Sequence, residues 1–178
     1  MRVSCSPCSL SYTLNATHRS HTLYAQGVPS FYTPALGERA EGSLHHKSSK
    51  FRDIMHIRLH SALVLLRGGL NVWLTDVDAV FNSDPFPYVT SAALGTHPSA
   101  LAYDTPFLPK GKNSPLMVMA GFFFLRRCVP SPDGAEEGHA SNCELLEETL
   151  AYMQRHPDKH DQFAFNAVLA EKEKQART

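Results

Sequence analysis

The chain contains the stretch Leu70-Asn71-Val72-Trp73-Leu74-Thr75-Asp76-Val77-Asp78-Ala79-Val80-Phe81, in which strand-forming residues lead into two carboxylates. Residues 72–75 favour β-structure, and the preceding Gly68-Gly69 ends whatever element lies upstream, so we predict a central strand here. Side chains alternate along an extended backbone, so Asp76 and Asp78 are expected to project on the same side. Neighbouring carboxylates repel one another unless a cation joins them, and Mg²⁺ and Mn²⁺ prefer such oxygen ligands. The stretch alone is compatible with a metal site or with a solvated turn whose acids cap the next element, and a bare Asp-x-Asp is more often such a turn, so the context has to decide.

Residues on both sides of this stretch place the acids in an α/β unit. Upstream, residues 50–67 carry apolar side chains at helical spacing, which predicts a helix capped by Ser48 or Ser49 and ended by Gly68. Downstream, Asp84-Pro85-Phe86-Pro87 predicts an extended, turn-rich path, because proline restricts itself and the residue before it. Ligands in open α/β sheets gather at the carboxyl ends of strands, so the acids are expected to lie where ligands bind.

The second half of the chain predicts two further strands and two helices. A short strand is expected near residues 100–104 and an apolar strand over residues 117–125. The latter is interrupted by Gly121, and a glycine within a strand often marks the close approach of a ligand or another backbone. A helix is expected over residues 142–154, and a last one begins at Asp161-Gln162. Without further context, Asp161 simply favours the positive end of that helix dipole.

Several of these residues fall into blocks whose order and spacing resemble a known family. The blocks are Lys50-Phe51, Arg58, Leu65-Leu66-x-Gly68-Gly69, Thr75-Asp76-Val77-Asp78, Asp84-Pro85-Phe86, Ala120-Gly121-Phe122-Phe123-Phe124-Leu125-Arg126 and Asp161-Gln162-Phe163-Ala164-Phe165-Asn166. Together they are similar to the nucleotide-diphospho-sugar transferase family, which includes plant arabinosyl- and xylosyltransferases of the cell wall. One position departs from the pattern, because Met119 stands where the family commonly has an asparagine.

The resemblance implies a GT-A fold, a Rossmann-type mixed α/β sheet flanked by helices. The matched transferase domain is expected to cover residues 46–178 and to be a partial domain. Residues 1–45 are expected to form a poorly ordered or partial N-terminal segment. Members of the family usually carry a signal-anchor and a first nucleotide-binding βα unit before the matched part, and we expect both to be truncated or absent here. The same resemblance implies a location in the Golgi lumen or membrane.

The resemblance also implies the chemistry and the residues of the site. The reaction expected is sugar transfer from a nucleotide-diphosphate donor, foremost a UDP-sugar, to a glycan or glycoprotein hydroxyl with retention of configuration. Asp76 and Asp78 form the DxD motif that holds Mn²⁺ or Mg²⁺, with Asp78 as the direct ligand. Residues implied to bind substrate are Asp76, Gly121, Lys50 and Arg58. Asp161 and Gln162 are implied as catalytic residues on the sugar face.

Composition narrows the possible partners and leaves the compartment open. The 178 residues are 43% hydrophobic, enough for one sizeable core. Seventeen basic and seventeen acidic residues cancel, so no net field favours nucleic acid. No apolar stretch reaches the roughly 20 residues of a membrane helix. The pair Cys5 and Cys8 has the spacing of half a zinc site but lacks a second pair, and the four cysteines fit either lumenal disulfides or free thiols.

Two other functions share the pattern of a strand followed by Asp-x-Asp. In a haloacid-dehalogenase-like phosphatase, Asp76 would be the nucleophile and Asp78 the general acid. That class also expects a later pair of adjacent acids, where this chain has Asp161-Gln162. The other alternative is a truncated glycosyltransferase domain that binds metal or glycan without turnover.

Overall fold

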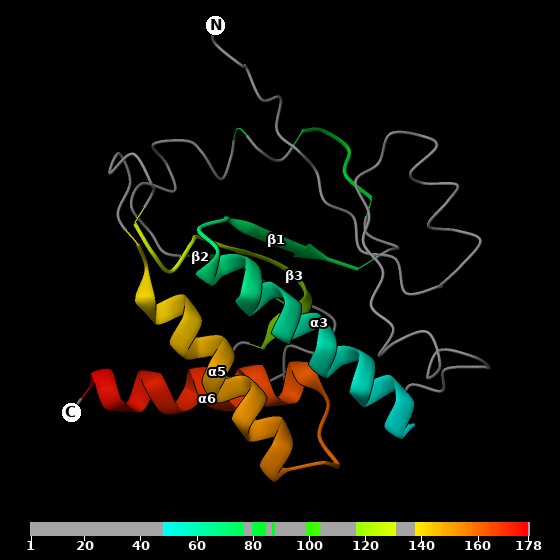
Figure 1. The fold of residues 1–178 in the computed structure, drawn as a ribbon. Helices are drawn as coiled ribbons and strands as arrows, with labels where there is room; N and C mark the ends of the chain where they lie inside the picture. Colours follow the sequence, from blue (N-terminus) through cyan, green and yellow to red (C-terminus); the bar gives the residue numbers. More distant parts are fainter. Residues whose placement is uncertain are drawn as a thin grey trace, which may run out of the picture. The chain divides into compact units, whose positions relative to one another are not determined.

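The computed structural model describes residues 48–76, 80–84, 87, 99–103, 117–130 and 138–177. The expectations for residues 1–45 and for Asp78 lie outside them. The elements are α3 (Ser49–Arg67), β1 (Val72–Thr75), β2 (Ser99–Tyr103), β3 (Val118–Leu125), α5 (Ala140–Arg155) and α6 (Asp161–Ala176). The chain divides after Ile54 into two units, and Met55–Thr178 holds the sheet, α5, α6 and most of α3 (Figure 1). The predicted elements in the described residues are therefore confirmed, whereas the predicted domain boundary stays a prediction.

Helix α3 begins and ends at residues whose side chains or backbone suit its termini. The hydroxyl of Ser48 accepts a hydrogen bond of 3.1 Å from the amide of Phe51, which satisfies one exposed N–H of the first turn. At the other end, Gly69 adopts a φ of 84° and the amide of Leu70 donates to the carbonyl of Leu65 at 3.1 Å. The left-handed residue is thus the second glycine of the pair, and the reversal it allows leads the chain directly into β1.

The sheet has the order β1-β3-β2, and both strand pairs are antiparallel. Val72 pairs with Leu125, and Thr75 pairs with Phe122. This confirms the mixed α/β class. Among the described strands, β3 lies in the middle, where β1 was expected, and the GT-A arrangement of the sheet stays a prediction. The physical reason lies in β3, whose eight residues are all apolar or glycine and pack on both faces of the sheet.

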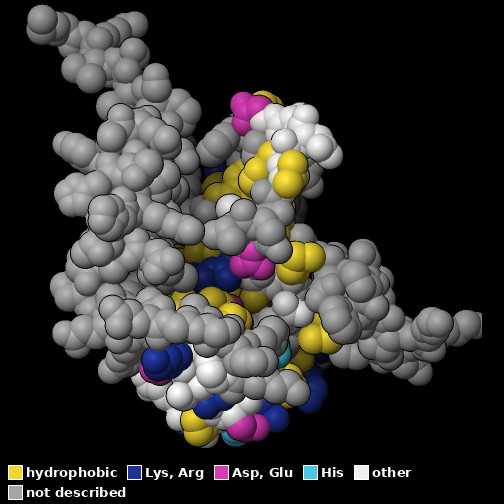
Figure 2. All heavy atoms as spheres, turned by 90° about the vertical axis from the view of Figure 1, so that its right-hand side faces the viewer, with side chains coloured by type: hydrophobic (Ala, Val, Ile, Leu, Met, Phe, Trp, Pro, Cys, Tyr) yellow, Lys and Arg dark blue, Asp and Glu magenta, His cyan; other side chains and the backbone are white. Residues whose placement is uncertain are grey.

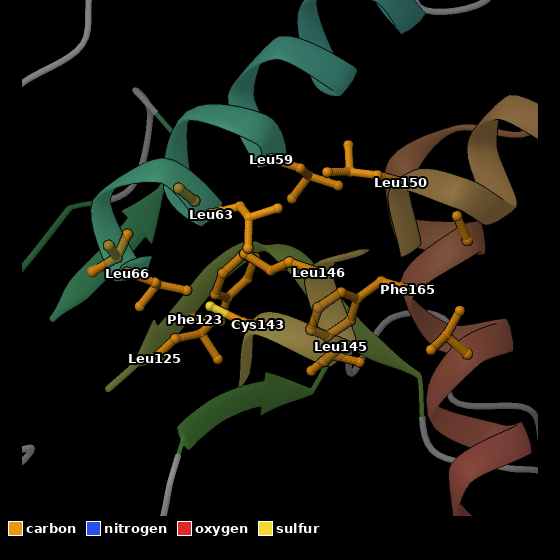
Figure 3. Close-up of a cluster of buried hydrophobic side chains, with 14 of the residues drawn as sticks. Leu59, Leu63, Leu66, Phe123, Leu125, Cys143, Leu145, Leu146, Leu150 and Phe165 are labelled. Atoms are coloured by element: carbon orange, nitrogen blue, oxygen red, sulfur yellow. The ribbon is translucent and has the colours of Figure 1, made fainter. Parts of the chain in front are cut away.

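One face of the sheet and the three helices enclose a common core within Met55–Thr178 (Figure 3). Its buried members are Leu59, Ala62, Leu63, Leu66, Val72, Val118, Phe123, Leu125, Cys143, Leu145, Leu146, Leu150, Met153, Ala164, Phe165 and Val168. At its centre the ring of Phe123 stacks on that of Phe165, with centroids 5.3 Å apart. Burial of these side chains from β1, β3, α3, α5 and α6 fixes the helices against the sheet.

A disulfide joins Cys128, just after β3, to Cys143 in the first turn of α5. The two Cα atoms are 5.8 Å apart, a usual separation for a disulfide. The bond closes the connection between β3 and α5 and decides the state of two of the four cysteines, which the sequence left open. Among the helices of the described residues, none is both long and apolar enough to cross a membrane.

Candidate functional site

Asp76 is the first residue after β1 and faces helix α3. Its amide donates a hydrogen bond of 2.7 Å to the carbonyl of Gly121, which extends the ladder between β1 and β3 by one residue. Alternation along the strand places the Asp76 side chain on the same face as Leu74, which packs against the core. The carboxylate therefore lies where the core ends, on the side of the sheet that the helices cover.

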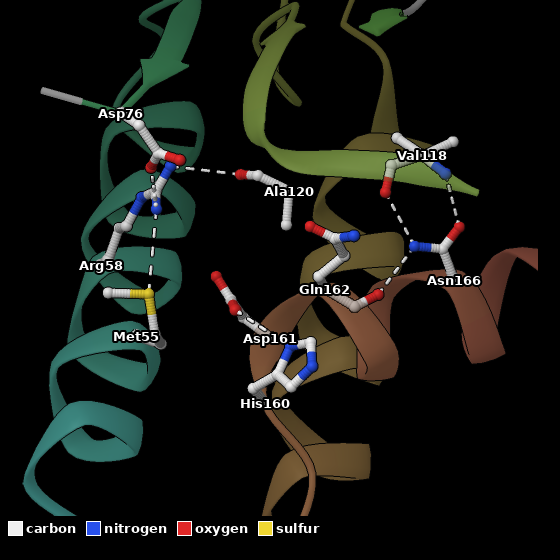
Figure 4. Close-up of polar contacts among 9 residues, drawn as sticks. All are labelled: Met55, Arg58, Asp76, Val118, Ala120, His160, Asp161, Gln162 and Asn166. Carbon is white, nitrogen blue, oxygen red and sulfur yellow. Dashed lines mark hydrogen bonds and ion pairs between the residues drawn. The ribbon is translucent and has the colours of Figure 1, made fainter. Parts of the chain in front are cut away.

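Arg58 of α3 meets this carboxylate. Its Nη1 donates to Oδ1 of Asp76 at 2.8 Å, and its Nη2 donates to the carbonyl oxygen of Ala120 at 3.2 Å (Figure 4). The sulfur of Met55, one turn earlier, lies 3.8 Å from Nη1. The Arg58 side chain is 15% exposed and that of Asp76 is 50% exposed, so the pair combines a covered cation with an accessible acid. Figure 2 shows basic and acidic side chains together among hydrophobic ones at the surface.

Gly121 provides the space into which the Asp76 carboxylate fits. A Cβ atom added at residue 121 would overlap the carboxylate and stand 2.6 Å from its Cγ. Backbone conformation does not require a glycine there, because Gly69 is the only described glycine with a positive φ. The sequence suggested the close approach of a ligand or another backbone at Gly121, whereas the group that fills this space is the side chain of Asp76.

Asp161 and Gln162 are the first two residues of helix α6. Asp161 is buried, with 5% of its surface exposed, and its Oδ1 lies 3.8 Å from Nδ1 of His160, beyond hydrogen-bond distance. In Figure 4 its carboxylate points away from α6 in the direction of α3. Arg58 on α3 donates hydrogen bonds to Asp76 and to the carbonyl of Ala120. On α6, the backbone carbonyl of Gln162 accepts a hydrogen bond from the side chain of Asn166. The catalytic role of Asp161 and Gln162 stays a prediction.

Asn166 has a structural role that the sequence motif did not reveal. Its Oδ1 accepts from the amide of Val118 at 2.7 Å, and its Nδ2 donates to the carbonyls of Val118 and Gln162 at 2.8 and 2.7 Å. The side chain thus holds the first residue of β3 against α6. The spacing of four residues between Gln162 and Asn166, one helical turn, is the only sequence signal that links the two.

Two further residues were predicted to take part in the site. Lys50 is exposed in the first turn of α3 and belongs to the unit that ends at Ile54, so its part in substrate binding stays a prediction. Asp78 lies outside the described residues. Within the described ranges, no three or more His, Cys, Asp or Glu side chains gather in a way that would hold a metal ion. The metal roles of Asp76 and Asp78 stay predictions as well.

Comparison with known proteins agrees with the resemblance seen in the sequence. A family model described as nucleotide-diphospho-sugar transferase matches residues 17–177. The chain is 30% identical over 135 residues to beta-arabinofuranosyltransferase RAY1 of Arabidopsis thaliana. That alignment covers 71% of this chain and 24% of the relative, so the chain spans about a quarter of the relative's length. No solved structure matches the chain. The matching family consists of transferases, and nothing in these comparisons points to a phosphatase.

Proposed function

Because the chain belongs to the nucleotide-diphospho-sugar transferase family, we propose that it moves a sugar from a nucleotide-diphosphate donor to a hydroxyl of a glycan or glycoprotein. The observation that carries this proposal is the half-exposed Asp76 carboxylate, held by Arg58 and fitted over Gly121 at the end of β1. The name of the plant relative, an arabinofuranosyltransferase, supports arabinofuranose as the first sugar to test. A UDP-linked donor and a cell-wall glycan acceptor are part of the proposal. Transfer with retention of configuration is part of the proposal.

Asp76 is suited to bind the donor rather than to act as a nucleophile. Oδ1 is engaged by the Arg58 guanidinium, which lowers its availability as an attacking group. The carboxylate remains half-exposed and can accept hydrogen bonds from ribose hydroxyls or from water bound to a metal. Because Arg58 and Gly121 fix its orientation before the donor arrives, less conformational freedom is lost on binding.

The two carboxylates of the motif are suitable ligands for a hard divalent cation. Carboxylate oxygens are the ligands that Mn²⁺ and Mg²⁺ prefer, and Asp76 and Asp78 stand two residues apart in the sequence. We assign Asp78 as the direct ligand and Asp76 as a ligand through water, since the Arg58 cation occupies Oδ1 of Asp76. When bound, the ion supplies charge stabilisation for the departing diphosphate.

Asp161 and Gln162 are proposed to act on the sugar face of the donor. Asp161 is a buried carboxylate, and it lies beyond hydrogen-bonding distance of its neighbour His160. Its negative charge would stabilise a positive charge that develops on the sugar ring. Gln162 keeps its backbone carbonyl in the hydrogen bond from Asn166 and has a side-chain amide able to contact sugar hydroxyls.

A location in the secretory pathway, with the Golgi lumen as the proposed compartment, is supported by the disulfide. Disulfides such as Cys128–Cys143 persist in oxidising compartments and are rare in the cytosol.

The test is calorimetric titration of the purified chain with UDP, with and without Mn²⁺, in parallel on Asp78→Ala. Asp158→Ala is a matched control, since it removes an exposed carboxylate from the loop between α5 and α6. We expect metal-dependent UDP binding in the wild type and the control and its loss in Asp78→Ala. A screen of UDP-sugars for transfer to arabinan and glycoprotein acceptors then follows.

Three outcomes would count against the proposal in different ways. Full transferase activity in Asp78→Ala would remove the metal assignment. Hydrolysis of a generic aryl phosphate that depends on Asp76 would favour the phosphatase alternative. Binding of UDP and Mn²⁺ without transfer to any acceptor would favour a non-catalytic domain.

A further inference from the structure

Two contacts fix helix α6 against strand β3. The side-chain amide of Asn166 pairs with both backbone groups of Val118, because its Oδ1 accepts from the amide at 2.7 Å and its Nδ2 donates to the carbonyl at 2.8 Å. One residue earlier on the helix, the ring of Phe165 stacks on that of Phe123, further along the strand (Figure 3). Hydrophobic burial is non-directional, whereas hydrogen bonds are confined to a narrow range of distance and angle. The Asn166 amide is therefore the contact that fixes the rotation of α6 about its own axis.

The stretch of β3 between these two contacts also holds the carboxylate of Asp76. Gly121 leaves the space that this carboxylate fills. The carbonyl of Ala120 accepts a hydrogen bond from Arg58, and the same guanidinium donates to Asp76. Asp76 and the first turn of α6 are thus positioned by neighbouring residues of one strand.

The first turn of α6 carries the two residues that we propose to act on the sugar. Asp161 shares a helix face with Phe165, one turn later. Gln162 shares the neighbouring face with Asn166, whose Nδ2 donates to the Gln162 carbonyl at 2.7 Å. The Asp161 side chain is 8% exposed and points in the direction of α3 (Figure 4). The rotation of α6 therefore decides where this carboxylate lies.

A small rotation of α6 would change the distance between the two acids. Side chains extend about 5–6 Å from a helix axis, so a rotation of about 10° would move a carboxylate by about 1 Å. A misplacement of about 1 Å can lower a reaction rate about a hundredfold. Asp76, which α3 and β3 hold through Arg58 and Gly121, would stay in place.

We propose that Asn166 is a positioning residue for sugar transfer, which fixes the rotation of α6 on β3 and thereby sets the Asp161 carboxylate relative to Asp76. This inference rests on the proposed function. Asn166 touches neither donor nor acceptor in this role, and it acts through Asp161 and Gln162. Its hydrogen bonds also stabilise the fold, so the experiment has to separate the effect on the reaction from the effect on stability.

The test compares Asn166→Ala and Asn166→Ser with the wild type. The serine hydroxyl can still donate to the carbonyl of Gln162 one turn earlier but is too short to reach Val118. Cys128→Ser with Cys143→Ser is the control, because loss of the disulfide destabilises the fold away from the proposed site. For each protein we would measure the urea unfolding free energy, the affinity for UDP in Mn²⁺ by calorimetry, and the rate of transfer to arabinan from UDP-arabinofuranose and the other UDP-sugars of the screen. Either Asn166 variant is enough for the test if the other does not fold.

We expect both Asn166 variants to bind UDP within about twofold of the wild type, because Asp76 is held without Asn166, and to transfer sugar at least about tenfold more slowly. The control should keep the affinity and the rate of the wild type. In an Asp161→Asn background, Asn166→Ala should cause no further loss of rate but the same loss of unfolding free energy, because only the effect on the reaction acts through the carboxylate.

A transfer rate equal to that of the wild type in a folded Asn166 variant would overturn the inference and leave the proposed function intact. The same holds for an equal loss of rate in the control, or for equal losses with and without the Asp161 carboxylate. A folded wild type that transfers sugar from none of the screened UDP-sugars would overturn the proposed function, and the inference with it.

Discussion

Arg58 and Asp76 form an ion pair of 2.8 Å that joins the middle of helix α3 to the first residue after strand β1. The same guanidinium reaches the carbonyl of Ala120 in β3, so one side chain connects a helix and two strands. This arrangement gives the acid a fixed orientation while half of its side chain stays exposed. Arg58 was predicted to bind substrate, and its observed contacts support a role in holding the acid.

Replacing Arg58 should affect nucleotide binding more than folding. Lysine keeps the charge but offers a compact ammonium, which cannot reproduce the two separate contacts of the guanidinium. Because the Asp76 end of the pair is half-exposed, we expect the ion pair to contribute about 0–1 kcal/mol to the unfolding free energy, and Arg58→Ala to cost more than Arg58→Lys because it also removes a largely covered side chain. UDP binding in Mn²⁺ should weaken in both variants, more strongly in Arg58→Ala, as measured by calorimetry.

A double-mutant cycle separates this role from direct substrate binding. If Arg58 acts through Asp76, the losses of affinity in Arg58→Ala and Asp76→Ala should be strongly non-additive. Additive losses would mean that Arg58 contacts the donor itself. Arg67→Ala is the matched control, because Arg67 also lies on α3 and pairs with a carboxylate, Glu147, at 2.5 Å.

Gly121→Ala should disturb Asp76 rather than the backbone. The added methyl group would displace the carboxylate, whose Cγ lies 2.6 Å from the position that a Cβ atom would take, and with it the contact to Arg58. We expect UDP binding in Mn²⁺ to be lost or weakened at least tenfold, roughly 1.4 kcal/mol. Calorimetric titration checks this.

The cause can be tested in a background that lacks the carboxylate. In Asp76→Ala the clash is gone, and alanine is compatible with the strand conformation at residue 121. Gly121→Ala should then be neutral or slightly stabilising in urea unfolding, by up to about 1 kcal/mol. A destabilisation of equal size in both backgrounds would show that another contact at Gly121 is responsible.

Loss of Asn166 should destabilise the junction of β3 and α6. Asn166→Ala leaves the amide and carbonyl of Val118 without their side-chain partner, which we expect to reduce the unfolding free energy by about 1–3 kcal/mol. Asn166→Asp keeps the acceptor but loses both donors and faces two carbonyls, so it should be at least as destabilising near neutral pH. Urea unfolding measures both variants, with Gln154→Ala, an exposed amide on α5, as the control.

Removal of the disulfide should reduce stability without altering the site. The bonded cysteines are separated by 15 residues, and the chain-entropy model gives about 3 kcal/mol for a loop of that length. We expect Cys128→Ser with Cys143→Ser to lower the unfolding free energy by up to this amount. Reductant should destabilise the wild type and leave the double-serine variant unchanged. Equal sensitivity of both proteins to reductant would contradict the assignment of this pair.

The sequence by itself determined the elements and the motif. Helix α3, strands β1 to β3 and helices α5 and α6 follow from periodicity and from residues such as Ser48 and the glycine pair, because these signals depend on near neighbours in the chain. The same holds for the Asp76-x-Asp78 motif and for the family, since both are carried by residue types in a set order.

Only the tertiary structure decided which residues meet. It placed β3 in the middle of an antiparallel sheet, directed Arg58 to Asp76, filled the space above Gly121 with a carboxylate, and paired Cys128 with Cys143. It also placed the Asn166 side chain where it hydrogen-bonds the start of β3, and it brought the ring of Phe81 into contact with that of Trp73. The reason is that these contacts join segments far apart in the chain, and their geometry depends on strand register and helix packing, which local patterns do not specify.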